Sequence, residues 1–338
     1  MAKGKREGAL LHVGVDVSQR TLAVAFRTAK GALDEETFAN DDTGIRNLVK
    51  RVEAGGHRRR VGIEATGTYG LAVCLALVEA QNEVMLIQPL AARRFAQACN
   101  TRAKTDRVDA RVLLDFAERM PFTPWTPPSP SLRELRAIAA RIQNLVELRT
   151  ADLNRQHALQ LDPKTPAAVW ADLQESLEAI ERRIQALLAA ALELIQADPE
   201  LREAHRIVTS TTGFADRSAI QILAQLLVLP ADLTPRQVVA FAGLDPQTVQ
   251  SGTSVRAVAH ISRRGNRALR CALYMPTLVA IQRCPTVAQA YKALLDRGKP
   301  KKVAQIALMR RLLQALWHML RTKQTWDPQK FGQRQIAA

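Results

Sequence analysis

The sequence predicts an α/β domain followed by all-α segments, and three observations support this prediction. Short apolar runs alternate with amphipathic helical patterns as far as Arg119. The Pro-rich stretch PFTPWTPPSPS then interrupts the pattern, and helical periodicity dominates after it. The 338-residue chain is long enough for two or three domains with separate cores.

The first section is predicted to begin with three strands before its first helix. Two hairpins followed by crossover helices give a mixed sheet in which the first and fourth strands can lie side by side and parallel. This is the ribonuclease-H-like order. The segments are, in order, strands HVGVDV, TLAVAFRT and DEETFAN, helix DDTGIRNLVKRVEAGG, strand RRRVGIEA, helix TYGLAVCLALVEAQ, strand EVMLIQP, and helices AARRFAQACN and KTDRVDARVLLDFAERM.

The middle section carries two long apolar seams with 3-4 spacing, one on each side of the LDPKTP break. Such seams are typical of a coiled coil or helical hairpin, formed within the chain or between chains, and an ordinary helical bundle fits equally well. The predicted domains are 1–125 (ribonuclease-H-like), 126–203 (coiled coil or hairpin) and 204–338 (basic and helical). The seam residues are Leu135, Ile138, Ile142 and Leu145, then Trp170, Leu173, Leu177, Ile180, Ile184, Leu187, Ala191 and Leu194.

The formal net charge of +16 is concentrated at the C-terminal end of the chain. Residues 251–338 contain 17 Lys and Arg but only two acids, Asp296 and Asp327. Such a surface is expected to meet a polyanion, with nucleic acid the leading candidate. The alternative is a solvated basic surface that maintains solubility. Only 4% of the residues are aromatic, which argues against base-stacking platforms as the main binding surface.

The cysteines and the N-terminal segment indicate a cytoplasmic protein. Cys74, Cys99, Cys271 and Cys284 form no C-x-x-C pair and no zinc-ligand spacing, so reduced, buried thiols are expected. The first residues lack the features of a signal peptide, and no run is apolar enough to cross a membrane.

Four carboxylates form the candidate catalytic group. Asp16 follows an apolar strand and Glu64 ends the fourth strand, so the two face each other if these strands are parallel neighbours. Asp106 and Asp109, in KTDRVDA, lie three residues apart on one face of a helix. By themselves these two acids fit a helix N-terminus, where acids are favoured for capping and by the helix dipole.

The set of four favours a metal site. A cluster of oxygen ligands without Cys or His suits Mg²⁺ or Mn²⁺, and a pair of such ions is the usual arrangement for activating phosphodiester oxygens. The metal would then meet the phosphate that the basic part of the chain attracts.

The C-terminal section supplies candidate phosphate contacts. No acid lies near the arginines in sequence, so phosphate contacts fit them better than buried ion pairs. Ser251, in QSGTS, fits a turn residue by pattern alone, because no adjacent acid–base pair marks it as activated. The candidate nucleic-acid-binding residues are Arg256, His260, Arg263, Arg264, Arg267 and Arg270, and, less specifically, Lys299, Lys301, Lys302, Arg310 and Arg311.

With these residues in view, the chain resembles the DEDD transposases of the IS-one-ten type, which include Piv-like DNA invertases. The resemblance covers nearly the full length. It implies that Asp16, Glu64, Asp106 and Asp109 are the four acidic positions and that Ser251 is the nucleophile. The motifs that carry it are GVDVSQ, IEATGTYG, KTDRVDAR, AFAGLDP, QSGTSVR and ISRRGNRALRCALY.

The resemblance also implies an architecture, a reaction and partners. Members have a RuvC-like domain, a coiled-coil middle and a C-terminal transposase domain. They cut and rejoin DNA for an insertion sequence, and a bridge RNA selects target and donor. A dimer or tetramer through the coiled coil is implied, acting at the bacterial nucleoid. The family often has Gly-x-Gly near the start of the last domain, where this chain has Gly213-Phe214-Ala215, which weakens a helix-hairpin-helix interpretation of that turn.

Three alternative functions remain open at the level of sequence. A RuvC-like nuclease or resolvase would use the same four acids with water as nucleophile. An actin-like or sugar-kinase ATPase would share the sheet order, but the chain has no second Gly-rich phosphate loop. A nucleic-acid-binding protein without catalysis would leave the four spaced acids unexplained.

Overall fold

A computed structural model describes residues 11–333 with the exception of eight short gaps. The chain divides into two compact units between Pro127 and Pro128. Side chains are also outside the description at 250–251, 255–256 and 332–333. The gaps are residues 29–30, 55–58, 65–68, 101–104, 163, 248–249, 252–254 and 257–259.

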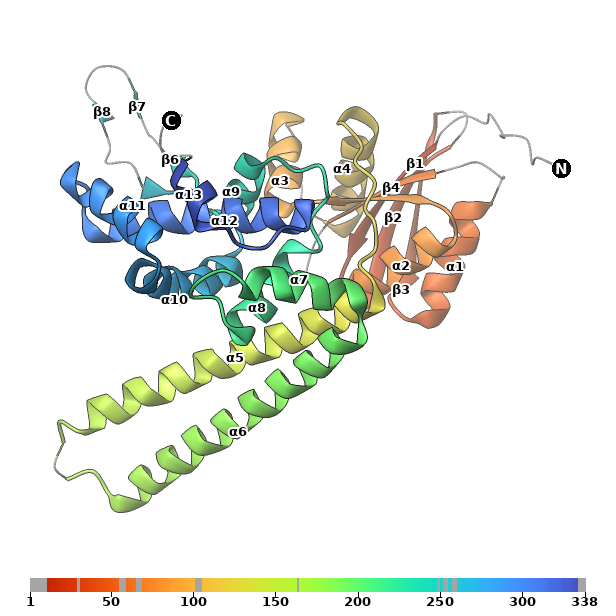
Figure 1. Ribbon diagram of the computed structural model, residues 1–338. Coiled ribbons are helices and arrows are strands. Elements are labelled where there is room, and N and C mark those ends of the chain that lie inside the picture. The colour runs from red at the N-terminus through yellow and green to blue at the C-terminus, as the bar shows by residue number, and fades with distance from the viewer. Residues whose placement is uncertain are drawn as a thin grey trace. The chain divides into compact units, whose positions relative to one another are not determined.

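The first unit is built on a five-stranded mixed sheet with the order β3-β2-β1-β4-β5 (Figure 1). The first three strands pair antiparallel through hairpins, whereas β1, β4 and β5 are parallel neighbours. The predicted sheet, with the first strand beside the fourth, is therefore confirmed. The strands are β1 (Leu11–Val17), β2 (Thr21–Arg27), β3 (Leu33–Ala39), β4 (Arg59–Glu64) and β5 (Glu83–Ile87).

Helices cover both faces of this sheet. The odd positions of β1, such as Val13 and Val15, pack with the apolar sides of α1 (Asp42–Glu53) and α2 (Leu71–Glu79). On the opposite face, Ala23 and Ala25 of β2 pack with Ala110 and Leu114 of α4 (Asp106–Arg119). Helix α3 (Pro89–Ala98) lies against α4. The side-chain alternation of β1, β2 and β4 therefore separates a large apolar core from a face of small residues that α4 covers.

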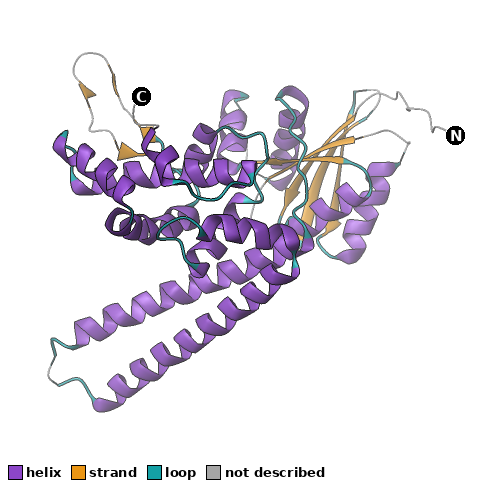
Figure 2. Cartoon of the chain, viewed as in Figure 1, coloured by secondary structure: helices purple, strands orange, loops and turns teal. Residues whose placement is uncertain are grey.

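The second unit begins with two long helices, α5 (Pro130–Leu159) and α6 (Ala167–Ala197), which form a hairpin (Figures 1 and 2). Ile142 and Leu145 of α5 are buried against Ile180 and Ile184 of α6. The two predicted seams therefore pair within one chain. Ser129 caps the first helix by accepting a hydrogen bond from the backbone N–H of Leu132 at 3.2 Å.

The remaining helices of this unit share one apolar core. Trp317 lies in this core and donates its indole N–H to the carbonyl oxygen of Leu233 at 2.9 Å. Two short antiparallel strand pairs, β6 with β9 and β7 with β8, stand between α9 and α10. No described helix is long and apolar enough to cross a membrane. The elements are α7 (Pro199–Thr209), α8 (Asp216–Leu226), α9 (Pro235–Phe241), β6 (Pro246–Gln247), β7 (Gln250–Ser251), β8 (Val255–Arg256), β9 (His260–Ile261), α10 (Arg267–Arg283), α11 (Pro285–Asp296), α12 (Lys301–Thr322) and α13 (Pro328–Gln333).

Two details of the structure refine the sequence predictions. All four cysteines are free thiols, but only Cys74 and Cys284 are buried, so the prediction of burial is wrong for Cys99 and Cys271. In the turn between α7 and α8, Gly213 has a φ of +95°, and a Cβ there would collide with the carbonyl oxygen of Pro276. Helix packing thus accounts for this glycine, whose backbone lies against α10.

Candidate active site

Two of the predicted acids stand at the carboxyl ends of neighbouring parallel strands. Val15 of β1 is paired with Ile63 of β4, so Asp16 and Glu64 are the next residues of the two strands. Alternation directs both acids to the face opposite the large apolar core. Both side chains are half-buried. The strand register therefore places these two carboxylates side by side, as the sequence predicted.

The other two acids stand on the first turns of α4. Thr105 caps this helix, accepting a hydrogen bond from the backbone N–H of Val108 at 3.3 Å. Neither Asp106 nor Asp109 is the N-cap residue, so capping does not explain them, although both lie in the first turn, where the helix dipole favours an acid. Asp106 is exposed and Asp109 is half-buried.

Close helix–sheet packing brings the two pairs together. Gly14 of β1 lies directly beneath α4, where a Cβ would collide with the carbonyl oxygen of Ala110 and the backbone nitrogen of Leu114. Gly14 is two residues before Asp16, so both lie on the face that α4 covers. Asp109 immediately precedes Ala110. The N-terminal turns of α4 therefore meet the strand end that carries Asp16.

The pKa of Asp16 reflects the closeness of the other three acids. Burial is the largest cause that raises the pKa of Asp16, and the negative charges of Asp109, Asp106 and Glu64 follow in that order. Together they raise the pKa of this carboxyl group to about 6, against a hydrogen bond from the backbone N–H of Val17 that lowers it. All four predicted acids thus interact at one end of the sheet.

The donor set suits a hard divalent cation. The four acids supply carboxylate oxygens only, as Mg²⁺ and Mn²⁺ prefer, and their mutual repulsion is the kind that a cation relieves. Within the described part of the chain, however, no three His, Cys, Asp or Glu side chains are arranged to hold a metal ion as they stand. Binding would require the carboxylates to move closer together.

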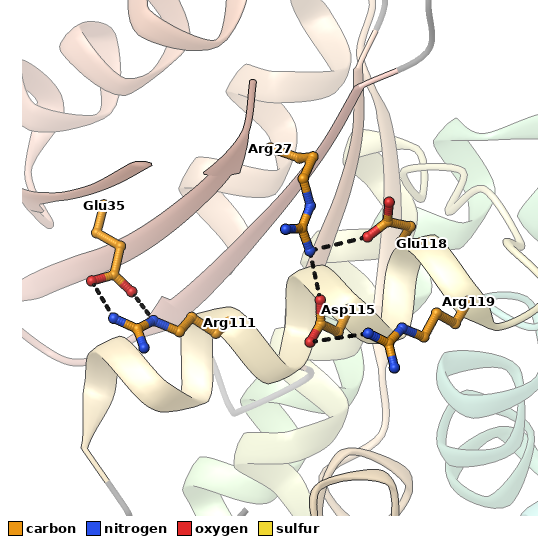
Figure 3. A network of polar contacts seen from close by, with 6 residues as sticks. All are labelled: Arg27, Glu35, Arg111, Asp115, Glu118 and Arg119. Carbon is orange, nitrogen blue, oxygen red and sulfur yellow. Dashed lines mark hydrogen bonds and ion pairs between the residues drawn. The ribbon is translucent and has the colours of Figure 1, made fainter. Parts of the chain in front are cut away.

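Ion pairs connect α4 to strands β2 and β3 (Figure 3). Arg111 of α4 forms a two-pronged pair with Glu35 of β3, with one N–O distance of 2.8 Å. Arg27, at the end of β2, donates to Asp115 at 2.8 Å and to Glu118 at 3.2 Å. These contacts connect the middle and end of α4 to the two antiparallel strands. Sequence reasoning missed them because the partners are 76 to 91 residues apart.

The second unit contains Ser251 and the predicted basic contacts. Ser251 lies on β7, where its backbone pairs with Val255 of β8, while its side chain and that of Arg256 are outside the described part of the chain. The side chains of five other predicted basic residues are exposed and remain candidates for phosphate contact. They are Arg263, Arg264, Lys299, Lys301 and Lys302.

Three other arginines make intramolecular contacts that the sequence did not indicate. Arg267 forms an exposed ion pair with Glu147 of α5, an acid 120 residues away in the sequence. Arg270 donates to the carbonyl oxygens of Ala242 and Gly265, at 2.8 and 3.1 Å. Burial lowers the pKa of Arg311, which also donates to the carbonyl oxygen of Phe331 at 2.7 Å. Arg270 and Arg311 thus contribute to packing.

Family models match both units of the chain. A model described as a DEDD transposase of the IS110 type matches residues 13–163, which include all four acids. A second, described as the transposase IS116/IS110/IS902 family, matches residues 205–293, which include Ser251. The chain belongs to the IS110 family of transposases. This is the family that its motifs resemble.

Individual relatives extend across the IS110-type chain. A pilin gene-inverting protein from Moraxella bovis is 25% identical over 324 residues, 94% of this chain and 97% of that protein. Its counterpart from Moraxella lacunata is 26% identical over 328 residues, with the same coverage. An insertion element IS110 protein from Streptomyces coelicolor is 30% identical over 149 residues, 44% of this chain and 36% of that protein. The transposase is therefore similar over nearly its whole length to two pilin gene-inverting proteins.

One signal for the site was present in the sequence but not used. Each strand acid is preceded by a glycine two positions earlier, as Gly14-Val15-Asp16 and Gly62-Ile63-Glu64. The two glycines are register partners on β1 and β4. A repeated Gly-x-acid pattern on two parallel strands indicates a helix packed closely beside the acids.

Proposed function

We propose that this IS110-family transposase cleaves and rejoins DNA through a covalent link to Ser251, using the carboxylates of Asp16, Glu64, Asp106 and Asp109 to hold Mg²⁺ or Mn²⁺. The observation that supports it best is the raised pKa of Asp16, because it reports three further acids close to one strand end. The strand order supports a ribonuclease-H-like fold for the first unit. Bound metal would neutralise the carboxylates and polarise the phosphate oxygens.

In the proposed reaction, the Ser251 hydroxyl oxygen attacks the scissile phosphorus. A phosphorus–oxygen bond to serine forms as the bond to one deoxyribose oxygen breaks, and the departing oxygen takes up a proton while serine loses one. The phosphoserine diester conserves the bond energy, so a new deoxyribose hydroxyl can displace the serine without an external energy source. The acids and Ser251 come from different units, so both units are required.

We also propose that the basic part of the chain binds nucleic acid, including a bridge RNA, and that the α5–α6 hairpin associates as a coiled coil into dimers or tetramers. The concentration of 17 basic and two acidic residues in 251–338 supports the first. The second is supported by exposed apolar side chains on the hairpin, such as Leu148 and Leu153.

The decisive experiment is a search for a protein–DNA adduct on a denaturing gel, in cells that carry the native flanking DNA. The adduct is expected in the wild type and absent in Ser251→Ala and Asp109→Asn. Two controls should retain it: Ser254→Ala, which changes the other serine of the same segment, and Asp115→Asn, which changes an α4 acid on the ion-paired side.

The result separates the proposal from the water-using nuclease. Cleaved DNA without an adduct, at equal levels in wild type and Ser251→Ala, would show that water is the nucleophile. An adduct that persists in Asp109→Asn would remove this acid from the catalytic site.

A further inference from the structure

The spacing between α4 and the sheet is set by two glycines. Gly14 and Gly62 are paired across β1 and β4, and each stands two residues before a candidate metal ligand. At Gly62, a Cβ would lie 2.8 Å from the carbonyl oxygen of Leu113 and 3.0 Å from the Cβ of Ala117. At Gly14 the clash with the α4 backbone would be closer still. A side chain at either position would therefore push α4 away from the sheet.

Movement of α4 has a direct consequence for the acids. Asp16 and Glu64 are fixed to the sheet, whereas Asp106 and Asp109 move with the helix. The Arg111–Glu35 and Arg27–Asp115 pairs hold the other flank of α4 to β3 and β2, so a helix lifted over β1 and β4 would tilt about that flank (Figure 3). The spacing between the two pairs of carboxylates would then change.

We infer that Gly14 and Gly62 are positioning residues of the proposed catalytic site, because their missing side chains let α4 pack close to the strand ends and so keep Asp106 and Asp109 near Asp16 and Glu64. This inference rests on the proposed function. Mg²⁺ requires nearly ideal octahedral geometry at about 2.0–2.1 Å, whereas Ca²⁺ accepts oxygen ligands at about 2.3–2.6 Å in flexible arrangements. Lifting α4 should therefore weaken Mg²⁺ binding more than Ca²⁺ binding.

The test is metal binding by the full chain carrying Gly62→Ala. Bound Mn²⁺ is measured by electron paramagnetic resonance, with Mg²⁺ and Ca²⁺ as competitors and no DNA present. The variant should lose about tenfold or more in affinity for Mn²⁺ and Mg²⁺ while its affinity for Ca²⁺ changes less than about threefold. A merely destabilised protein would lose affinity for all three ions together.

Gly70→Ala is the matched control. Gly70 lies in the same unit with a φ of −87°, and a Cβ there would meet only Val17 Cγ2 at an ordinary 3.8 Å. This variant should bind all three metals like the wild type. Gly14→Ala is expected to impair folding, as judged by thermal melting, because its Cβ has only backbone atoms to displace.

The outcomes distinguish the inference from the function it rests on. If wild type and Asp16→Asn bind Mn²⁺ equally, the proposed metal site is wrong. If Asp16→Asn abolishes binding but a folded Gly62→Ala retains wild-type affinity and Mg²⁺ selectivity, the metal site stands and the positioning role is overturned.

Discussion

At the scale of single residues, the candidate site is a group of like charges in a partly buried position. Asp16 is the centre of this group: burial first, then Asp109, Asp106 and Glu64, raise its pKa to about 6. Without a cation, the ionised form of Asp16 is less favourable in the folded chain than in the unfolded chain. The same interactions that suit the carboxylates for catalysis therefore reduce stability.

The free energy of unfolding of the metal-free protein should be lower when Asp16 is ionised. A raised pKa means that the folded state keeps the Asp16 proton to higher pH, so the contribution of Asp16 to stability is greatest below about pH 4 and falls as the pH rises to about 6. Asp16→Asn lacks this loss. Above pH 6 it should exceed the wild type in free energy of unfolding by about 1–2 kcal/mol, since partial exposure reduces the roughly 2.7 kcal/mol of a two-unit shift.

Chemical denaturation at pH 4, 6 and 8, in the presence of a chelator, measures this difference. The exposed Asp172 of α6 provides the control, because Asp172→Asn should give the same small difference from wild type at each pH. A gap between Asp16→Asn and wild type that does not widen from pH 4 to pH 6 would contradict the assignment of the repulsion to Asp16.

At the scale of elements, the packing of α4 on the sheet stabilises the first unit, and the seam between α5 and α6 stabilises the hairpin of the second. Helix α4 packs on small residues of β1, β2 and β4 and is paired by charge to β2 and β3. The α5–α6 hairpin depends instead on an apolar seam that includes Ile142, Leu145, Ile180 and Ile184. Each buried side chain of this seam should therefore contribute measurably to the stability of the hairpin.

Truncating one seam residue should loosen the hairpin. Ile184 is fully buried against α5, so Ile184→Ala should cost about 2–5 kcal/mol through lost burial and a cavity. Hydrogen exchange of the backbone amides of α5 and α6 should accelerate accordingly. Leu161→Ala, at a position 82% exposed in the connecting loop, should leave exchange unchanged. Equal exchange in both variants would show that the seam does not stabilise the hairpin.

At the scale of the whole molecule, acidic and basic functions are divided between the two units. The four acids belong to the first unit, and the C-terminal excess of Lys and Arg belongs to the second. A polyanion attracted to the second unit would be repelled by the acids unless a metal neutralised them. Nucleic-acid binding and metal binding should therefore be coupled in a working transposase.

The contribution of exposed arginines is measurable as salt dependence. Replacing Arg263 and Arg264 together by Ala should reduce the slope of log affinity for DNA against log salt by about two, if each contacts one phosphate. Fluorescence anisotropy over a salt series gives this slope. The adjacent exposed pair Arg182 and Arg183 of α6 provides a matched control, and equal slopes for the two double variants would remove Arg263 and Arg264 from the proposed interface.

The sequence by itself determined the order of the strands and helices, the candidate acids and the family. Periodicity and turn chemistry are local properties of the sequence. They therefore predict a strand at HVGVDV and helices at the two seams without any knowledge of packing. The Pro-rich break and the uneven charge are equally properties of the linear chain.

Only the tertiary structure decided how those elements meet. It paired the two seams within one chain, assigned Arg267 to Glu147, and showed that Arg270 and Arg311 hold backbone carbonyls. It also showed that α4 packs directly on Gly14 and Gly62. Because of this packing, four acids from three distant segments lie close enough to interact electrostatically. Each of these contacts joins residues far apart in the chain, where no local spacing rule applies and only packing and strand register select the partner.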